Sequence, residues 1–180
     1  MKTKVVTTDG AAPYVYDPLV TLNRFLRLHQ LLLASFTENL ENVHDINLND
    51  FRVLMMVGQQ GETASHEIAE LTGMPVMAIS RTVSALEKRG LISRSVDVSN
   101  RRRKPIVLTE QGQTLFNTML PTSERVAHYA FDSLRLDEAL AFDHHLQTIT
   151  DRVLMTDEDG VSVFIASTGP ASAQKEAETP

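Results

Sequence analysis

Basic side chains gather in one short part of this 180-residue chain. Residues 81–104 hold eight lysines and arginines but only two acids, whereas the other 156 residues hold nine basic and 21 acidic residues. The eight are Arg81, Lys88, Arg89, Arg94, Arg101, Arg102, Arg103 and Lys104. Attraction for phosphate depends on the local potential more than on the net charge, which is −6 here. The pattern therefore indicates an anion-binding face, although a solvated run of charges gives the same count.

Histidines are the other residues in this sequence that suit chemistry or metal binding. They are His29, His44, His66, His128, His144 and His145. No two of them have the spacing HxxxH or HExxH, and adjacent positions such as 144 and 145 diverge by about 100° around a helix. We expect no metal and no cofactor, with a site built from His44 and His128 across helices left open as an alternative.

Several other classes of protein are disfavoured by what the sequence lacks. It has no cysteine, which excludes disulfides, thiolate metal sites and cysteine redox sensing. It has no P-loop, Rossmann glycine pattern, nucleophile elbow or metal-hydrolase signature, so we do not expect an enzyme. No apolar run approaches the roughly 18 residues of a membrane span, and the first ten residues lack the apolar core of a secretion signal. We expect a cytoplasmic protein that does not bind a membrane.

The periodicity of apolar residues predicts the elements that carry the basic segment. Helices are expected over about 18–41, 48–59, 65–71, 75–89, 110–120 and 137–155, with helical spacing resuming after Pro121 as far as 134. Strands are expected at 91–96 and 105–109. In the third helix we expect Ile68 and Leu71 to face the core, and Asn47 is expected to cap the second helix. The fold is therefore mainly α with a small β-hairpin.

This order of elements predicts a winged helix-turn-helix. The helix over 75–89 carries Ile79, Val83 and Leu86 on one face, which suits packing on a core. Its other side carries Ser80 and Arg81, a short polar group and a cation of the kind that read the major groove. The tip of the hairpin carries three consecutive arginines, which suit a narrow minor groove or its phosphates.

The same segments resemble the MarR (multiple antibiotic resistance regulator) family over about residues 18–155. The resemblance is carried by Ile68–Leu71, Ile79–Arg81, Leu86–Ile92, Asp97–Arg102 and Leu108–Gly112. It implies an obligate homodimer that acts on palindromic double-stranded DNA, usually as a repressor. The implied parts are an N-terminal dimerisation helix at 17–46, the DNA-binding domain at 47–112 and C-terminal dimerisation helices at 113–156. The polar, small-residue composition of the two ends indicates a flexible arm at 1–16 and a disordered tail at 157–180.

The resemblance assigns DNA contacts to Ser80 and Arg81 on the helix over 75–89 and to the hairpin arginines Arg101, Arg102 and Arg103. The other candidate DNA contacts are His66, Val76, Met77 and Ser84. Arg102 is the first choice for insertion into the minor groove. The chain departs from the family at Asn100, where an aspartate usually braces the wing arginine, and at Val76 and Met77, which replace a more polar helix start and suit contact with thymine methyl groups.

Members of the family commonly release DNA when they bind a ligand, so we expect a small organic effector, an aromatic acid or a thioester. Candidate effector-binding residues are Arg24, Arg27, His29 and Met55, because the family's pocket lies between the dimerisation helices and the DNA-binding lobe. A ligand-independent regulator, an activator, a metal-responsive regulator and a winged helix that binds protein rather than DNA remain as alternatives.

Overall fold

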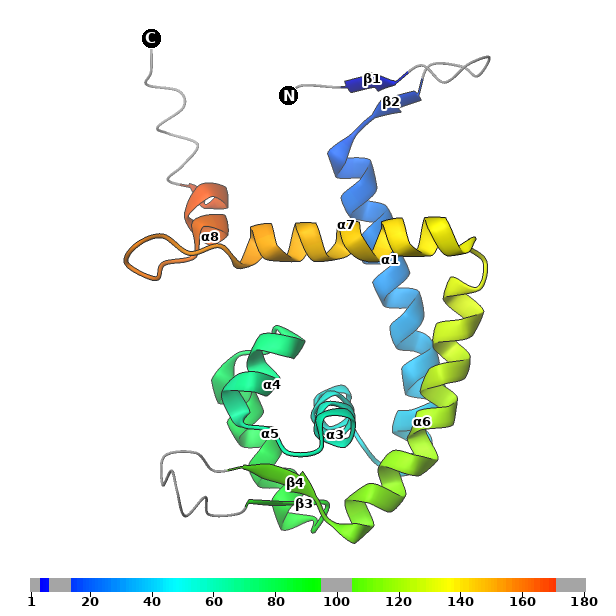
Figure 1. Ribbon diagram of the computed structural model, residues 1–180, viewed down its shortest axis with the longest axis vertical. Coiled ribbons are helices and arrows are strands. Elements are labelled where there is room, and N and C mark those ends of the chain that lie inside the picture. Colours follow the sequence, from blue (N-terminus) through cyan, green and yellow to red (C-terminus); the bar gives the residue numbers. More distant parts are fainter. Residues whose placement is uncertain (1–3, 7–13, 95–104, 171–180) are drawn as a thin grey trace. The chain divides into compact units, whose positions relative to one another are not determined.

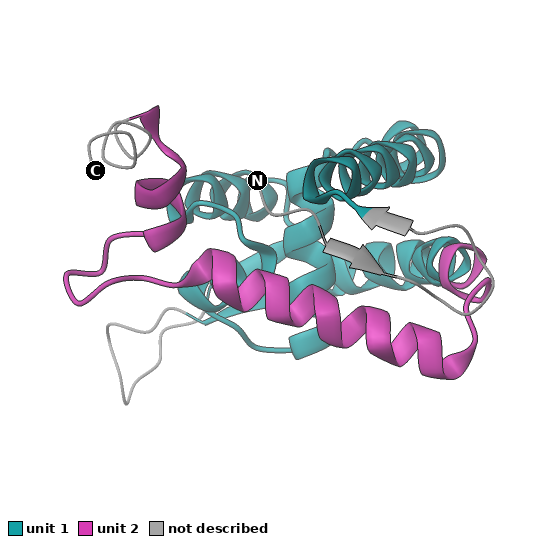
Figure 2. Ribbon diagram, turned by 90° about the horizontal axis from the view of Figure 1, so that it is seen from above, with its two compact units in different colours: residues 1–127 teal, residues 128–180 magenta. Residues whose placement is uncertain are grey.

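The computed structural model of the chain describes residues 4–6, 14–94 and 105–170. The chain divides into two compact units, Met1–Ala127 and His128–Pro180, which Figure 2 shows in different colours. The described part is mainly helical, as the periodicity predicts, with two short antiparallel strand pairs, of which the sequence predicts only the second (Figure 1).

A short strand pair and a long helical segment begin the first unit. Strands β1 (Lys4–Val6) and β2 (Tyr14–Tyr16) pair antiparallel, so the prediction of a flexible arm over 1–16 is wrong for these residues. Helix α1 (Pro18–Phe36) follows directly, with the Asp17 carboxylate accepting a hydrogen bond from the backbone of Leu19 at 2.8 Å. A π-helix, η1 (Thr37–Glu41), and one turn of helix, α2 (Asn42–His44), continue it slightly beyond the predicted end at 41.

The helix-turn-helix consists of α3 (Leu48–Gln60), α4 (Ser65–Thr72) and α5 (Val76–Lys88). Asn47 caps α3 as predicted, and its side-chain oxygen accepts hydrogen bonds from the backbone N–H groups of residues 49 and 50. Gly73 ends α4 with a φ of 66°, a left-handed conformation that glycine adopts without strain.

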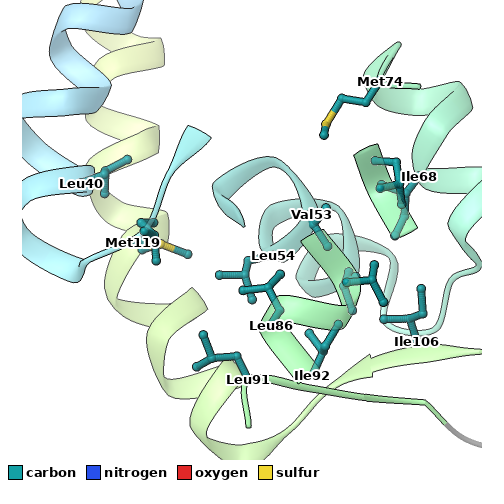
Figure 3. Packing of buried hydrophobic residues seen from close by; sticks show 14 of the residues in the cluster. Leu40, Val53, Leu54, Ile68, Met74, Leu86, Leu91, Ile92, Ile106 and Met119 are labelled. Atoms are coloured by element: carbon teal, nitrogen blue, oxygen red, sulfur yellow. The ribbon is translucent and has the colours of Figure 1, made fainter. Parts of the chain in front are cut away.

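The core lies among these three helices and the neighbouring strands, and Leu40 of η1 and Met119 further along the chain also belong to it (Figure 3). Ile79, Val83 and Leu86 have no exposed surface, which confirms the predicted inner face of α5. Ile68 is equally buried, but Leu71 is 58% exposed, so the prediction that Leu71 faces the core is wrong. Leu71 lies in the last turn of α4, and Met74, beyond the end of the helix, joins the core cluster.

The hairpin forms where the sequence predicts it. Strands β3 (Ile92–Arg94) and β4 (Ile106–Leu108) pair antiparallel with Ile92 opposite Leu108, and Thr63 adds a bridge to Ile106. The tip, residues 95–104, lies outside the described residues.

Helix α6 (Glu110–Phe131) is attached to the base of the hairpin by Thr109 and Gly112. The Thr109 hydroxyl donates to the Gly90 carbonyl at 2.6 Å and accepts from the Gly112 N–H at 3.1 Å. A Cβ atom on Gly112 would overlap the carbonyl oxygen of Leu91, so only glycine fits this close approach. The Leu-Thr-x-x-Gly motif therefore fixes where α6 leaves the hairpin.

Pro121 does not interrupt α6, which runs through it to Phe131 as one helix. Proline removes only one intrahelical hydrogen bond, and the residues on both sides keep helical spacing. The predicted break after 120 is therefore wrong.

The second unit consists mainly of α7 (Leu136–Leu154) and α8 (Val163–Thr168). The expected disorder of 157–180 is wrong for part of that range. Thr156 forms a β-bridge with Ser162, Asp157 accepts two backbone hydrogen bonds, and the Ser162 hydroxyl caps α8. Among the described helices of the chain, none is long and apolar enough to cross a membrane.

We expect Gly112→Ala to lower the free energy of unfolding by roughly 1–3 kcal/mol, the usual cost of forcing an extra group into a packed site. The measurement is denaturant unfolding at one fixed protein concentration. Gly169→Ala is the matched control, since its Cβ would meet the Ile165 carbonyl oxygen at an ordinary 3.4 Å. Equal midpoints for the two variants would contradict the packing argument.

Candidate nucleic-acid interface

The outer face of α5 begins with two exposed apolar side chains and continues with a polar pair. Val76 is 56% exposed and Met77 67% exposed at the start of the helix. Ser80 and Arg81 are exposed one turn further along. Because the opposite face is packed into the core, α5 is held as a rigid element that presents these four side chains outward. The structure therefore brings four of the predicted contact residues onto one helix surface.

Ser84 is half-buried and bonded within the domain. Its hydroxyl donates to the Ser80 carbonyl at 2.9 Å and accepts from Nη2 of Arg94 at 3.1 Å. Arg94 lies at the end of β3, and its Nε is 3.5 Å from Oε2 of Glu87 on α5. Arg94 therefore joins the base of the hairpin to α5. Sequence reasoning missed this role because it considered Arg94 only as one of the basic residues of the segment.

A second arginine fixes the far end of α5. Nη1 of Arg89 donates to the Asp50 carboxylate at 3.1 Å, and its Nη2 donates to the Asp45 carbonyl at 2.7 Å. Asp50 is buried, and the same carboxylate oxygen accepts from the backbone N–H and side-chain amide of Asn47. The cap of α3 and the end of α5 are thus held by one carboxylate.

The remaining predicted DNA contacts lie elsewhere. His66 is exposed in the first turn of α4. Arg101, Arg102 and Arg103 fall in the hairpin tip, outside the described residues.

A cavity of about 580 Å³ lies beside α5, between the end of α1, η1 and the start of α3. We call it the α5 cavity. Its lining residues are Leu33, Phe36, Thr37, Glu41, Asn47, Leu48, Asn49, Asp50, Arg81, Thr82 and Ala85. Leucine and phenylalanine side chains form its apolar part, while Glu41 and Asp50 bring two carboxylates to it and Arg81 brings one guanidinium. Such a mixture suits a small organic ligand with polar ends.

The predicted effector residues do not line this cavity. Arg24, Arg27 and His29 are exposed along α1, and Met55 is 7% exposed on α3. The cavity instead uses the last turn of α1 and the π-helix, which periodicity alone does not single out. Among the described residues, no three histidine or acidic side chains are grouped to hold a metal ion.

We expect Arg94→Ala to speed amide hydrogen exchange in β3 and β4 by roughly tenfold. The substitution removes the contacts to Ser84 and Glu87, which together stabilise the hairpin by about 1 kcal/mol or slightly more. Exchange is measured by mass spectrometry or NMR. The control is Arg125→Ala on α6, an exposed arginine that bonds only to its neighbour Thr122 among the contacts described for it. Unchanged protection of the hairpin would show that Arg94 does not brace it.

Comparison with known proteins finds a family model that matches part of this chain. Residues 46–104 match the model of the MarR family. The HTH-type transcriptional repressor NicR of Pseudomonas putida is 27% identical over 149 residues, which cover 81% of this chain and 94% of NicR.

Solved structures show the same fold. The structure of BpsR from Bordetella bronchiseptica, whose DNA binding is regulated by 6-hydroxynicotinic acid, has a TM-score of 0.62 and 24% identity, covering 75% of this chain and all of BpsR. A MarR-family regulator from Listeria monocytogenes in complex with a 26mer DNA has a TM-score of 0.66 and 20% identity, covering 77% of this chain and 89% of that one. The relative and both structures are of transcriptional regulators rather than enzymes. Residues 46–104 thus match the MarR family model, and the chain has the winged-helix fold of these transcriptional regulators.

Proposed function

We propose that the protein is a cytoplasmic, homodimeric repressor that binds a palindromic DNA site and is released from it by a small aromatic acid. The observation that carries the DNA-binding part is the outer face of α5. It presents Val76, Met77, Ser80 and Arg81 to solvent while its inner face is fully packed. The names of NicR, a repressor, and of the Listeria regulator solved with DNA support the same proposal.

Each side chain on that face has a role in the proposed contact. The Arg81 guanidinium suits a guanine edge or a phosphate, and the Ser80 hydroxyl suits either. Val76 and Met77 are apolar and exposed, which suits thymine methyl groups in the major groove. Arg102, with Arg101 and Arg103 beside it, would reach the neighbouring minor groove from the hairpin tip. Arg94 would set the direction of that tip by bonding the hairpin to α5.

The proposed dimer rests on apolar surface that one copy leaves in water. On α1 the exposed residues include Leu19, Leu22, Phe25, Leu26 and Leu31. On α7 they include Leu136, Leu140, Ile149 and Leu154. Exposed apolar surface of this extent is unusual on a monomer and is typical of an interface. A twofold dimer also matches a palindromic site, because each copy reads one half-site.

The proposed effector site is the α5 cavity. Arg81 lies both in this cavity and on the outer face of α5, so a ligand carboxylate bound to its guanidinium would compete with DNA for the same group. Glu41 would accept a hydrogen bond from a hydroxyl or ring N–H at the other end of the ligand. An aromatic acid with such a donor fits both ends, and BpsR responds to a compound of this kind, 6-hydroxynicotinic acid.

The DNA-binding test uses the segment upstream of the protein's own gene, titrated over a salt series. Changing Arg81 and Arg102 together to alanine is expected to weaken binding at least a hundredfold, since each such contact contributes roughly 1–3 kcal/mol and the dimer makes each one twice. The salt dependence should also become shallower, because fewer counterions are released.

The control for that experiment is the double variant Arg125→Ala and Arg135→Ala, which removes two exposed arginines outside the proposed interface. The DNA-binding proposal fails if the two double variants bind equally, or if wild-type protein binds this segment no better than random DNA and a genome-wide selection recovers no preferred site.

The effector test asks whether 6-hydroxynicotinic or salicylic acid releases the bound DNA. We expect Ala85→Phe to fill the α5 cavity and abolish release, while leaving DNA affinity within about threefold of wild type. Gln59→Phe adds the same ring at an exposed position outside the cavity and should respond as wild type does. Release that survives Ala85→Phe would place the effector elsewhere.

A further inference from the structure

A second cavity, of about 410 Å³, lies on another side of the DNA-binding domain, between α2, the end of α5 and α6. We call it the α6 cavity. Its lining residues are His44, Arg89, Leu91, Gln111, Thr114, Leu115 and Thr118. None of these residues lines the α5 cavity, and none belongs to the outer face of α5. Its volume lies within the range of small-molecule sites.

The chemistry of the α6 cavity is that of a site for an anion. No acidic side chain is among the described residues that line it, whereas the Arg89 side chain is 36% exposed. A guanidinium has five N–H donors. The bonds of Arg89 to Asp50 and to the Asp45 carbonyl use one each, which leaves donors that can face a ligand carboxylate. The Gln111 amide can donate as well.

The two threonines of the cavity can accept hydrogen bonds from a ligand that also carries hydroxyl groups. The Thr114 hydroxyl donates to the Glu110 carbonyl and the Thr118 hydroxyl donates to the Thr114 carbonyl, both within α6. With their hydrogens engaged in this way, both oxygens remain able to accept a hydrogen bond. A ligand O–H is the matching donor, and Leu91 and Leu115 supply apolar contact for its carbon chain.

We propose that the α6 cavity is a second ligand site, which binds a small hydroxylated carboxylate such as a sugar acid. The carboxylate binds Arg89 and Gln111, and the ligand hydroxyls donate to Thr114 and Thr118. Binding at this site does not depend on the proposed effector or on DNA binding.

A ligand bound in the α6 cavity would affect α5 through the ion pair between Arg89 and Asp50. Arg89 caps the C-terminus of α5, and its partner Asp50 lines the α5 cavity. A ligand carboxylate on the remaining donors of Arg89 would share the guanidinium with Asp50 and so alter that ion pair. Ligands in the two cavities would therefore alter each other's affinity. This coupling, unlike binding itself, rests on the proposed function.

The test is calorimetric titration of the full-length protein with gluconate, with acetate and glucose as separate arms. Gluconate is expected to bind, while acetate, which lacks hydroxyls, and glucose, which lacks the carboxylate, bind at least tenfold more weakly. Gln111→Leu should weaken gluconate binding about tenfold. Gln113→Leu is the matched control two residues along α6, where the side chain bonds to Asn117 outside the cavity. Amide shifts in NMR spectra should map gluconate to residues 89, 111 and 118.

Absence of gluconate binding, equal binding of acetate, or equal affinity of the two glutamine variants would overturn the assignment of this site. Thermal unfolding of both variants identifies a loss that comes from misfolding, and Thr118→Val then provides an independent second variant with the same expected loss. DNA binding is measured on the same samples. A protein that binds DNA but not gluconate contradicts only the α6 cavity, and one that binds gluconate but not DNA contradicts only the proposed repressor.

Discussion

The buried carboxylate of Asp50 is the interaction on which the arrangement of the DNA-binding domain depends. One of its oxygens accepts hydrogen bonds from the backbone and side chain of Asn47 and from the guanidinium of Arg89. The same group therefore caps α3 and holds the C-terminal end of α5, residues that lie 39 positions apart in the chain. An unpaired carboxylate in this buried position would be costly, so the cap and the ion pair stabilise each other.

The recognition helix is consequently held at both ends and along its inner face. Arg89 fixes its end, Arg94 joins it to the hairpin, and the apolar stripe of Ile79, Val83 and Leu86 seats it on the core. A rigid helix suits the reading of base edges, because misplaced donors lose most of their discrimination. The same rigidity means that a ligand acting on Arg81 or Arg89 acts on the whole helix. Both cavities border α5, which makes that helix the element through which ligands would act on DNA binding.

Two helices outside the DNA-binding domain, α1 and α7, carry exposed apolar surface. The domain itself buries a compact core, yet α1 and α7 leave large apolar side chains in water. A second copy is the occupant that the proposed function assigns to these faces. In that arrangement the relative placement of the two α5 helices depends on the dimerisation helices, and η1, the π-helix that follows α1, also borders the α5 cavity. Segments of π-helix are uncommon and often mark functional positions.

The sequence alone determined those features that depend on neighbours along the chain. Helical periodicity identified the buried face of α5, Asn47 marked the start of α3, and the motif Leu-Thr-x-x-Gly located the start of α6. The tertiary structure decided which side chains meet across elements. Asp50 with Arg89, Ser84 with Arg94, and the lining of both cavities join residues whose separation in sequence carries no signal. Leu71 and Pro121 were mispredicted for the same reason, because burial and helix continuity depend on packing that local propensity does not encode.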